Sequence, residues 1–355
     1  MKPDLSILIP TFARPAKIGA CVAALARQSL PHERYEVIVG LDGPDPASVE
    51  AITRVWDGPE DSLIIDVAPH SGPSAVRNRM LARARADSVL FLNDDVVPSG
   101  TLAEIHALEQ AAANRRGRPA LVVGSAPWKR YTNEVLFDRL VRETSMVFFY
   151  DAMDTPQGLA QPMKDWGFRH AWSLNLSGPR NLIQDAGGFT VFPQPFYGYE
   201  DIELAHRLAH QFATPVLYRP GARVEHDHRM DLAEYLRREY TIGHEAWTVA
   251  RMRPQFASEL FARDITAPEE EEYCRAYVER ERPLARRLKE TLEEAALLPS
   301  DLLSGESGRV LRRMFYEQHL PLKRWAWRLG LLDAIDHKAM SPAPIDIISD
   351  HRAAA

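Results

Sequence analysis

Four short apolar segments in the first hundred residues restrict the folds that this chain can adopt. They span residues 5–11, 35–41, 63–67 and 89–92, and helical patterns follow Pro15, begin at Ala75 and begin near Ser99. Apolar runs of this length are typical of strands buried on both faces of a sheet. Strands that alternate with helices at this spacing form right-handed β-α-β units. The sequence therefore predicts an α/β fold with a mostly parallel sheet flanked by helices.

The predicted strands all end in polar residues, namely Thr11, Asp42, Ser71 and the pair Asp94-Asp95. Parallel strands present their carboxyl ends along one edge, where open α/β sheets bind ligands. Adjacent carboxylates repel each other and are costly to desolvate, so a strand end that carries two usually exposes them to solvent, a cation or a ligand. The alternative is an acidic turn before the next helix, because caps and turns use the same residue types.

Composition places the chain among ordinary globular proteins. Its 355 residues carry a net charge of -6, with 45% hydrophobic and 26% charged residues. The length predicts one large domain and a smaller one, and nothing suggests nucleic-acid binding. The two cysteines, Cys21 and Cys274, are expected to be free or buried thiols, which suits a reducing compartment. Since no signal-peptide core or run of about 18 apolar residues is present, we expect a cytoplasmic protein.

Two further motifs follow downstream. A strand pattern over residues 172–177 and a helix precede an aromatic loop, Phe196 to Asp201, which leads into a predicted helix over 202–209. Glu200 and Asp201 thus stand at a helix N-terminus, where a carboxylate serves as a cap or as a functional group. In the segment Arg223 to His228, His226 and His228 share one face if the chain is extended, which brings two imidazoles to one site.

The order of these motifs resembles glycosyltransferase family 2, whose members have the nucleotide-sugar-binding GT-A fold. The matching residues are Ile9-Pro10-Thr11-Phe12 with Arg14, Gly40-Leu41-Asp42-Gly43, Ser71-Gly72-Pro73 with Ala75, Arg77 and Asn78, Phe91-Leu92-Asn93-Asp94-Asp95 with Pro98, Asn175-Leu176-Ser177, Gly187-Gly188-Phe189, Tyr197 to Leu204, and Pro220 to His226. Each motif alone is weak, but their shared order is specific, and the resemblance covers about residues 4–229.

The resemblance implies a donor site and a metal site. Asp95 would bind a divalent cation, Mn²⁺ or Mg²⁺, with His226 as an additional ligand and His228 as the alternative, and an imidazole ligand favours Mn²⁺. Asp94 would contact the ribose or a metal-bound water, and Asp42 would accept a hydrogen bond from the base, commonly uracil. The other residues assigned to the nucleotide sugar are Pro10, Thr11, Arg14, Arg77 and Asn78, with Asn78 expected to bond backbone across the crevice. The family often has Asp where this chain has Asn93, which removes one charge.

The resemblance also points to Asp201 as the general base that deprotonates the acceptor hydroxyl, with Glu200 as its neighbour holding the acceptor or the loop. Both roles are compatible with helix capping. Residues 120–170 are harder to interpret, and their aromatic side chains either pack in the core or stack on sugar faces.

The expected domains are a catalytic domain, 1–229, and a helical C-terminal extension, 230–355, with a disordered tail after about residue 340. Residues 231–263 and 269–298 have helical patterns. Basic residues interleave with Phe315, Tyr316, Trp325 and Trp327 in the last segment. Helices of this kind lie in a membrane interface, where a lipid-linked acceptor would be found, or simply pack as an appendage.

The sequence therefore predicts an inverting, metal-dependent glycosyltransferase that moves a sugar from a nucleoside diphosphate sugar, with UDP as the default, to a glycan, lipid-linked or protein acceptor. Such an enzyme would act in cell-surface glycan or glycolipid synthesis, in the cytoplasm or at the inner face of the membrane. One alternative is a sugar-phosphate nucleotidyltransferase, although residues 9–12 lack the Gly-rich basic loop it would need. The other is a non-catalytic nucleotide- or glycan-binding protein of the same fold.

Overall fold

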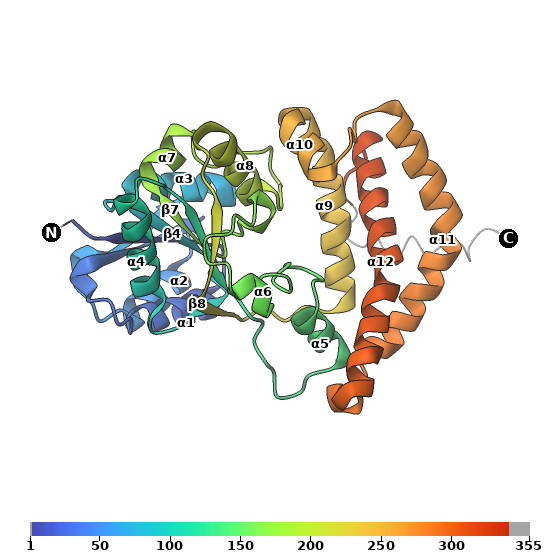
Figure 1. Ribbon diagram of the computed structural model, residues 1–355, viewed down its shortest axis with the longest axis horizontal. Coiled ribbons are helices and arrows are strands. Elements are labelled where there is room, and N and C mark those ends of the chain that lie inside the picture. The colour runs from blue at the N-terminus through green and yellow to red at the C-terminus, as the bar shows by residue number, and fades with distance from the viewer. Residues whose placement is uncertain (1, 341–355) are drawn as a thin grey trace. The chain divides into compact units, whose positions relative to one another are not determined.

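The computed structural model describes residues 2–340 and divides into two compact units (Figure 1). The first, here called the sheet unit, comprises Met1–Lys129, Phe148–Pro195 and Tyr199–His228. The second, the helical unit, comprises Arg130–Val147, Phe196–Gly198 and the chain from Arg229 onward. Two short segments from inside the first 229 residues thus group with the C-terminal helices. The tail expected after residue 340 lies outside the described residues.

The four strands predicted from the N-terminal segments are present and parallel. They are β1 (Leu5–Thr11), β2 (Tyr35–Asp42), β3 (Leu63–Ala68) and β4 (Ser88–Leu92). They lie in the order β3-β2-β1-β4, and the interior residues of β1, β2 and β4 are almost fully buried. This part of the fold follows the prediction from apolar runs.

The other half of the sheet makes it mixed. Its strands are β5 (Val96–Pro98), β6 (Leu121–Ser125), β7 (Asn175–Pro179) and β8 (Val216–His226), and the full order is β3-β2-β1-β4-β7-β6-β8-β5. β7 runs antiparallel to both β4 and β6, and β5 runs antiparallel to β8, whereas β6 and β8 are parallel. The α/β fold with flanking helices is confirmed, and four of the seven strand pairs in the described residues are parallel.

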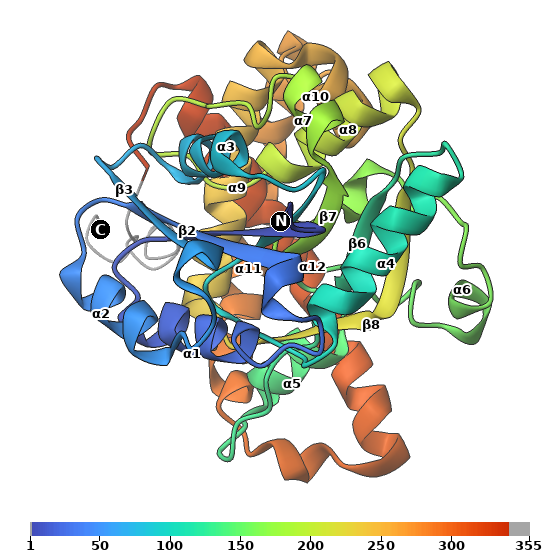
Figure 2. The same cartoon turned by 90° about the vertical axis from the view of Figure 1, so that its left-hand side faces the viewer.

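Helices cover both faces of the parallel strands. α1 (Pro15–Leu25) and α2 (Pro46–Val55) lie on one face, and α3 (Pro73–Arg83) lies on the other (Figure 2). All three have proline in the first turn, where its missing N–H costs nothing. The remaining helices and turns of this unit are α4 (Leu102–Arg115), α6 (Pro156–Leu159), α7 (Arg180–Asp185), α8 (Glu200–Phe212), η1 (His32–Arg34), η2 (Glu60–Ser62) and η3 (Phe168–His170).

A buried polar network links α4 to the sheet. The His106 ring contacts the Ser177 hydroxyl at 2.8 Å and the Asn175 side-chain oxygen at 2.9 Å, and it is fully buried. Asn175 in turn donates to the backbone oxygens of Ser125 and Ala222. Burial lowers the pKa of His106 to about 4, so the ring is neutral at neutral pH. The network thus holds β7 against the strands on either side of it.

The helical unit is built from α5 (Leu136–Glu143), α9 (Leu232–Met252), α10 (Pro254–Phe261), α11 (Pro268–Ala296), η4 (Ser300–Leu303) and α12 (Gly305–Ile335). α9 and α12 approach closely through two glycines. A Cβ at Gly243 would lie 1.9 Å from the Trp327 carbonyl oxygen, and one at Gly330 would lie 2.0 Å from the Tyr240 carbonyl oxygen. Glycine is required at both positions because any side chain would meet backbone.

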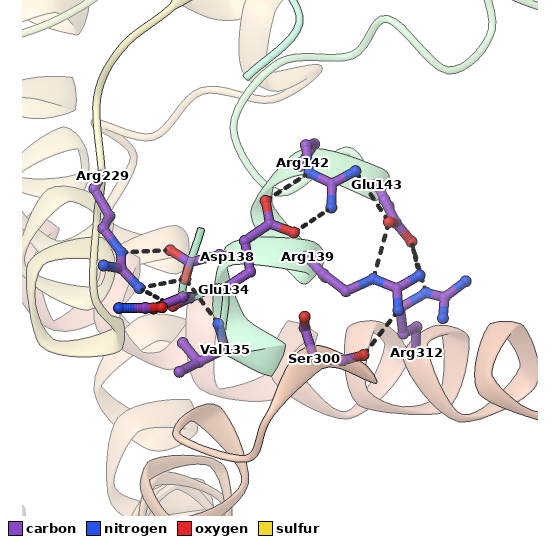
Figure 3. Close-up of polar contacts among 10 residues, drawn as sticks. Glu134, Val135, Asp138, Arg139, Arg142, Glu143, Arg229, Ser300 and Arg312 are labelled. Atoms are coloured by element: carbon purple, nitrogen blue, oxygen red, sulfur yellow. Dashed lines mark hydrogen bonds and ion pairs between the residues drawn. The ribbon is translucent and has the colours of Figure 1, made fainter. Parts of the chain in front are cut away.

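An ion-pair network fastens α5 within the helical unit (Figure 3). Glu143 accepts from Arg139 and Arg142 of its own helix and, at 2.7 Å, from Arg312 of α12. Arg139 also donates to the Ser300 carbonyl oxygen at 2.9 Å. The network explains why segment 130–147 groups with the C-terminal helices although it lies between β6 and β7 in the chain.

Both cysteines are free and buried, as predicted, with Cys21 in the sheet unit and Cys274 in the helical unit. Among the described residues, no helix has the length and apolar character needed to cross a membrane. Trp325 is 1% exposed and donates to the Val278 carbonyl oxygen of α11, so this aromatic residue packs inside the helical unit.

Candidate active site

The carboxyl ends of β1, β2 and β4 bring the predicted polar residues to one edge of the sheet. Pro10 and Thr11 of β1 lie beside Gly40 and Leu41 of β2, and Asp42 is the last residue of β2. A Cβ at Gly40 would lie 2.5 Å from a methyl group of Val76, so glycine here lets α3 pack directly on β2.

Asp94 and Asp95 follow β4 and are 6% and 7% exposed. The Thr11 hydroxyl donates to Asp94 at 2.8 Å, and one Arg14 nitrogen lies 3.2 Å from Asp94 and 3.3 Å from Asp95. Burial raises the pKa of Asp94 above its usual range, although Arg14 opposes the shift. Two adjacent carboxylates therefore share one guanidinium in a nearly buried position, as the β4 sequence predicted.

Two histidines face the other side of Asp95. His226 Nε2 lies 3.6 Å from Asp95 Oδ1, and His228 Nδ1 lies 3.5 Å from Asp95 Oδ2. The antiparallel pairing of β5 with β8 sets this position, because it aligns Val96 with His226. Burial raises the pKa of Asp95, but the two imidazoles lower it by more, and it ends well below its usual range.

These residues suit a divalent cation. Asp95 Oδ1 is buried without a hydrogen-bond partner, and its separation from the histidine nitrogens is too long for an ordinary hydrogen bond. A carboxylate oxygen and imidazole nitrogens that each coordinate one Mn²⁺ or Mg²⁺ at about 2.1 Å stand roughly 3 Å or slightly more apart. The donor set therefore fits the metal site expected at Asp95, His226 and His228.

Asp42 closes the turn before α3. Its carboxylate accepts from the backbone N–H groups of Ser71 at 2.6 Å and Gly72 at 3.0 Å, and His70 Nδ1 lies 3.0 Å away. The His70 and Phe12 rings lie 4.9 Å apart, and Phe12 is 57% exposed. Asp42 thus has the turn role, beside an exposed aromatic surface, and its contact with a base stays a prediction.

Arg77 and Asn78 organise the crevice from below. Arg77 is 4% exposed and donates to Glu200 Oε1 at 3.1 Å and to Asn93 Oδ1 at 3.4 Å. Asn78 donates to the Phe189 carbonyl oxygen and accepts from the Phe189 N–H, which are the backbone bonds expected of it. The structure gives both side chains protein partners, and their contact with a nucleotide stays a prediction.

Asp201 stands in the first turn of α8, held by two backbone groups. The Ser173 N–H donates to Oδ2 at 3.0 Å and the Ile202 N–H to Oδ1 at 2.8 Å. The preceding Gly198 and Tyr199 both have positive φ, 89° and 70°, which turns the chain sharply into the helix. Burial and the neighbouring Glu200 carboxylate raise the pKa of Asp201 to about 6. An aspartate of this kind is a suitable proton acceptor near neutral pH.

Sequence reasoning missed several residues around Asp95. Trp128 lies over His226 with ring centroids 4.2 Å apart, and its place in an aromatic segment was the only signal. Lys17 and Lys129 both contact Asp227, the residue between the two histidines. No spacing in the sequence connects these residues, because they come from α1, from the chain after β6 and from the end of β8.

Comparisons with known proteins agree with this architecture. Residues 6–140 match the model of glycosyl transferase family 2. A pre-mycofactocin glycosyltransferase of Mycobacterium tuberculosis is 30% identical over 197 residues, which cover 54% of this chain and 38% of that protein. A validoxylamine A glucosyltransferase of Streptomyces hygroscopicus subsp. limoneus is 27% identical over 233 residues, 60% of this chain and 49% of that protein. The chain thus spans half or less of these relatives.

Among solved structures, a mannosyltransferase from Pyrobaculum calidifontis in complex with GDP-Man and Mn²⁺ is similar, with a TM-score of 0.55 and 14% identity over 96% of this chain and 89% of that chain. At this identity the likeness concerns the fold alone, which is the GT-A fold. Together with the family match and the curated relatives, it confirms the resemblance found in the sequence. The chain belongs to glycosyl transferase family 2.

Proposed function

We propose that this protein is an inverting, metal-dependent glycosyltransferase that moves a sugar from a nucleoside diphosphate sugar to an acceptor hydroxyl. The observation that carries the proposal is the buried Asp95 carboxylate, which shares Arg14 with Asp94 on one side and faces His226 and His228 on the other. Such a cluster offers both cation ligands and groups for a polar, charged substrate, and family membership supports the same chemistry.

Asp95, His226 and His228 would hold the cation, and the two imidazoles favour Mn²⁺ over Mg²⁺. When bound, the cation supplies positive charge that neutralises the departing nucleoside diphosphate. Arg14 adds a second positive charge beside the same carboxylates. Asp94 and Thr11 would contact the ribose, and Asp42 the base beside the Phe12 and His70 rings. Uridine is the proposed base.

Asp201 would act as the general base. The two N–H groups that hold its oxygens orient the carboxylate, and its raised pKa increases its basicity. In a single displacement, Asp201 takes the proton of the acceptor hydroxyl, the acceptor oxygen bonds to C1 of the sugar, and the bond from C1 to the diphosphate oxygen breaks. Attack from the side opposite the leaving group inverts the configuration at C1. Glu200, bound to Arg77, keeps this part of the helix in place.

The acceptor is proposed to be a hydroxyl of a glycan, a lipid-linked molecule or a protein. Aromatic side chains near the metal ligands support a sugar-like acceptor: Phe148 lies 5.3 Å from Trp172 and 5.8 Å from His226, and Phe149 is 44% exposed. Such rings stack on sugar faces. Peripheral membrane contact through α12 would rely on exposed Arg309 and Arg313, since Trp325 is buried.

A thermal-shift panel tests the proposal. UDP, GDP, ADP, CDP and TDP are added with Mn²⁺ or with EDTA, because a ligand that binds only the native state raises the melting temperature. At least one diphosphate should raise it with Mn²⁺ and do so much less with EDTA, and the matching sugar nucleotides should be hydrolysed slowly. A stabilised protein without hydrolysis would favour the non-catalytic binder. Stabilisation by no diphosphate would overturn the proposal.

A further inference from the structure

Two lysines converge on one carboxylate beside the candidate metal ligands. Lys17 Nζ and Lys129 Nζ each lie 3.1 Å from Asp227 Oδ2, and Lys17 also donates to the Asp227 carbonyl oxygen at 2.5 Å. Lys17 belongs to α1, Lys129 follows β6, and Asp227 directly follows β8. We call these three residues the lysine clamp.

The backbone of the clamp is tied to the candidate metal site. The Asp227 N–H donates to the Asp95 carbonyl oxygen at 2.8 Å, and the Lys129 N–H donates to the His226 carbonyl oxygen at 2.9 Å. Asp227 also lies between His226 and His228 in the chain. The two ammonium groups are therefore fixed next to the carboxylate and imidazoles that suit a cation.

The charges within the clamp do not balance. One carboxylate faces two ammonium groups, which leaves a net charge of +1, and the two like charges repel each other. A single lysine would suffice for a structural ion pair. The lysine side chains are 37% and 38% exposed, whereas that of Asp227 is 16% exposed, so a ligand in solution can reach the cations more easily than the anion. An added anionic group would balance the excess charge.

We propose that Lys17 and Lys129 bind the diphosphate of the donor and of the released nucleotide, and that Asp227 holds the two ammonium groups in place before the donor arrives. This inference rests on the proposed function, which supplies a diphosphate at the candidate metal site. Ammonium groups form strong, charge-assisted bonds to phosphate oxygens, and they stabilise the charge that the diphosphate gains as the sugar leaves.

The clamp makes a prediction that a purely structural ion pair does not. In a structural pair, loss of either partner only weakens the fold. In the clamp, Asp227 competes with the diphosphate for the same ammonium groups, so Asp227→Asn should strengthen diphosphate binding, while Lys17→Met and Lys129→Met should weaken it. The opposite signs separate the two explanations.

The experiment measures the dissociation constants of UDP, GDP and inorganic pyrophosphate by calorimetry with Mn²⁺, in the full-length protein. For whichever of these the wild type binds, each lysine variant should weaken binding about 5- to 10-fold, and the double variant more, given the strength of charged hydrogen bonds and the partial exposure of the lysines. Asp227→Asn should bind a few-fold more tightly. The parent nucleoside, which lacks phosphate, should bind all variants equally.

Lys2→Met is the matched control, because Lys2 also pairs with an aspartate, Asp87, at 2.7 Å, but is far from the carboxyl ends of the strands. It should leave every constant unchanged. Lys17→Arg and Lys129→Arg keep the charge and should bind diphosphate nearly as well as the wild type, which guards against loss of fold in the methionine variants.

Unchanged diphosphate binding in folded lysine variants, or equal weakening by Asp227→Asn, would overturn the clamp while leaving the proposed function intact. A wild-type protein that binds neither a nucleoside diphosphate nor pyrophosphate would instead refute the proposed function itself.

Discussion

Replacing Asp201 with asparagine removes the proposed base at little cost to the local structure. Asparagine keeps one oxygen for the Ser173 or the Ile202 N–H, so one hydrogen bond is lost, worth about 1 kcal/mol. A positioned general base contributes about 10²- to 10⁴-fold to a rate. Asp201→Asn should therefore lower the transfer rate by at least about 100-fold, while the donor dissociation constant stays the same, because the ligands of the donor lie elsewhere.

The pH dependence gives the same prediction a second readout. The base must be deprotonated, so the rate should rise with pH through the pKa of Asp201, raised to about 6. From pH 7 to pH 5, a group of pKa about 6 falls from about 90% to about 10% deprotonated, whereas an ordinary aspartate stays above about 90%. The wild-type rate should thus fall about 10-fold over this range.

Glu200→Gln supplies the control for the cause of the shift. It removes the negative charge beside Asp201 and leaves the Arg77 guanidinium without its carboxylate partner. Both changes favour the charged form of Asp201, so the fall in rate should move to lower pH. The assay is the release of nucleoside diphosphate from the donor at saturating Mn²⁺, with water or sugar as the acceptor. A rate for Asp201→Asn equal to that of the wild type would refute the assignment of the base.

Three further predictions concern the metal ligands and the fold. His226→Gln should weaken Mn²⁺ binding by about 10- to 100-fold, as loss of one ligand does, and more than His228→Gln because His226 is more buried; Mn²⁺ electron paramagnetic resonance measures both, and equal affinity in the two variants would contradict the ranking. His106 should make the protein less stable as pH falls from about 6.5 to 4, because the unfolded chain takes up a proton that the buried ring, with its pKa of about 4, refuses. The loss approaches about 3 kcal/mol and appears in urea unfolding at several pH values, whereas His106→Gln should show a flatter profile. Gly330→Ala should destabilise the helical unit by about 2 kcal/mol or more, because its Cβ would overlap the Tyr240 carbonyl oxygen; an unchanged melting temperature would argue against the close helix packing.

The sequence was sufficient to predict the parts of the fold that depend on local patterns. The apolar runs gave β1 to β4, and the acidic end of β4 indicated the cluster at Asp94 and Asp95. It could not give the direction of β7, since a short buried strand has the same composition in either direction and only the path of the chain decides. The region between β6 and β7 was also obscure because part of it packs with the C-terminal helices.

Within the candidate site, residues in named motifs were predictable and their partners were not. The His-x-His spacing suggested that both imidazoles share a site, and the structure places both beside Asp95. Arg77, assigned to the nucleotide, instead pairs with Glu200, a contact between residues 123 positions apart in the chain. Lys17, Lys129 and Asp227 meet only through tertiary structure, so no pattern in the sequence marks them.

The most direct test of a metal-assisted donor site is linkage between Mn²⁺ and the nucleotide. Mn²⁺ affinity is measured with and without the nucleoside diphosphate that stabilises the protein most, in the wild type and in Asp95→Ala. In the wild type each ligand should strengthen the binding of the other by the same factor, since coupling is reciprocal, and Asp95→Ala should abolish the effect. If the two ligands bind independently, or if the variant retains the coupling, the cation and the diphosphate do not meet at Asp95.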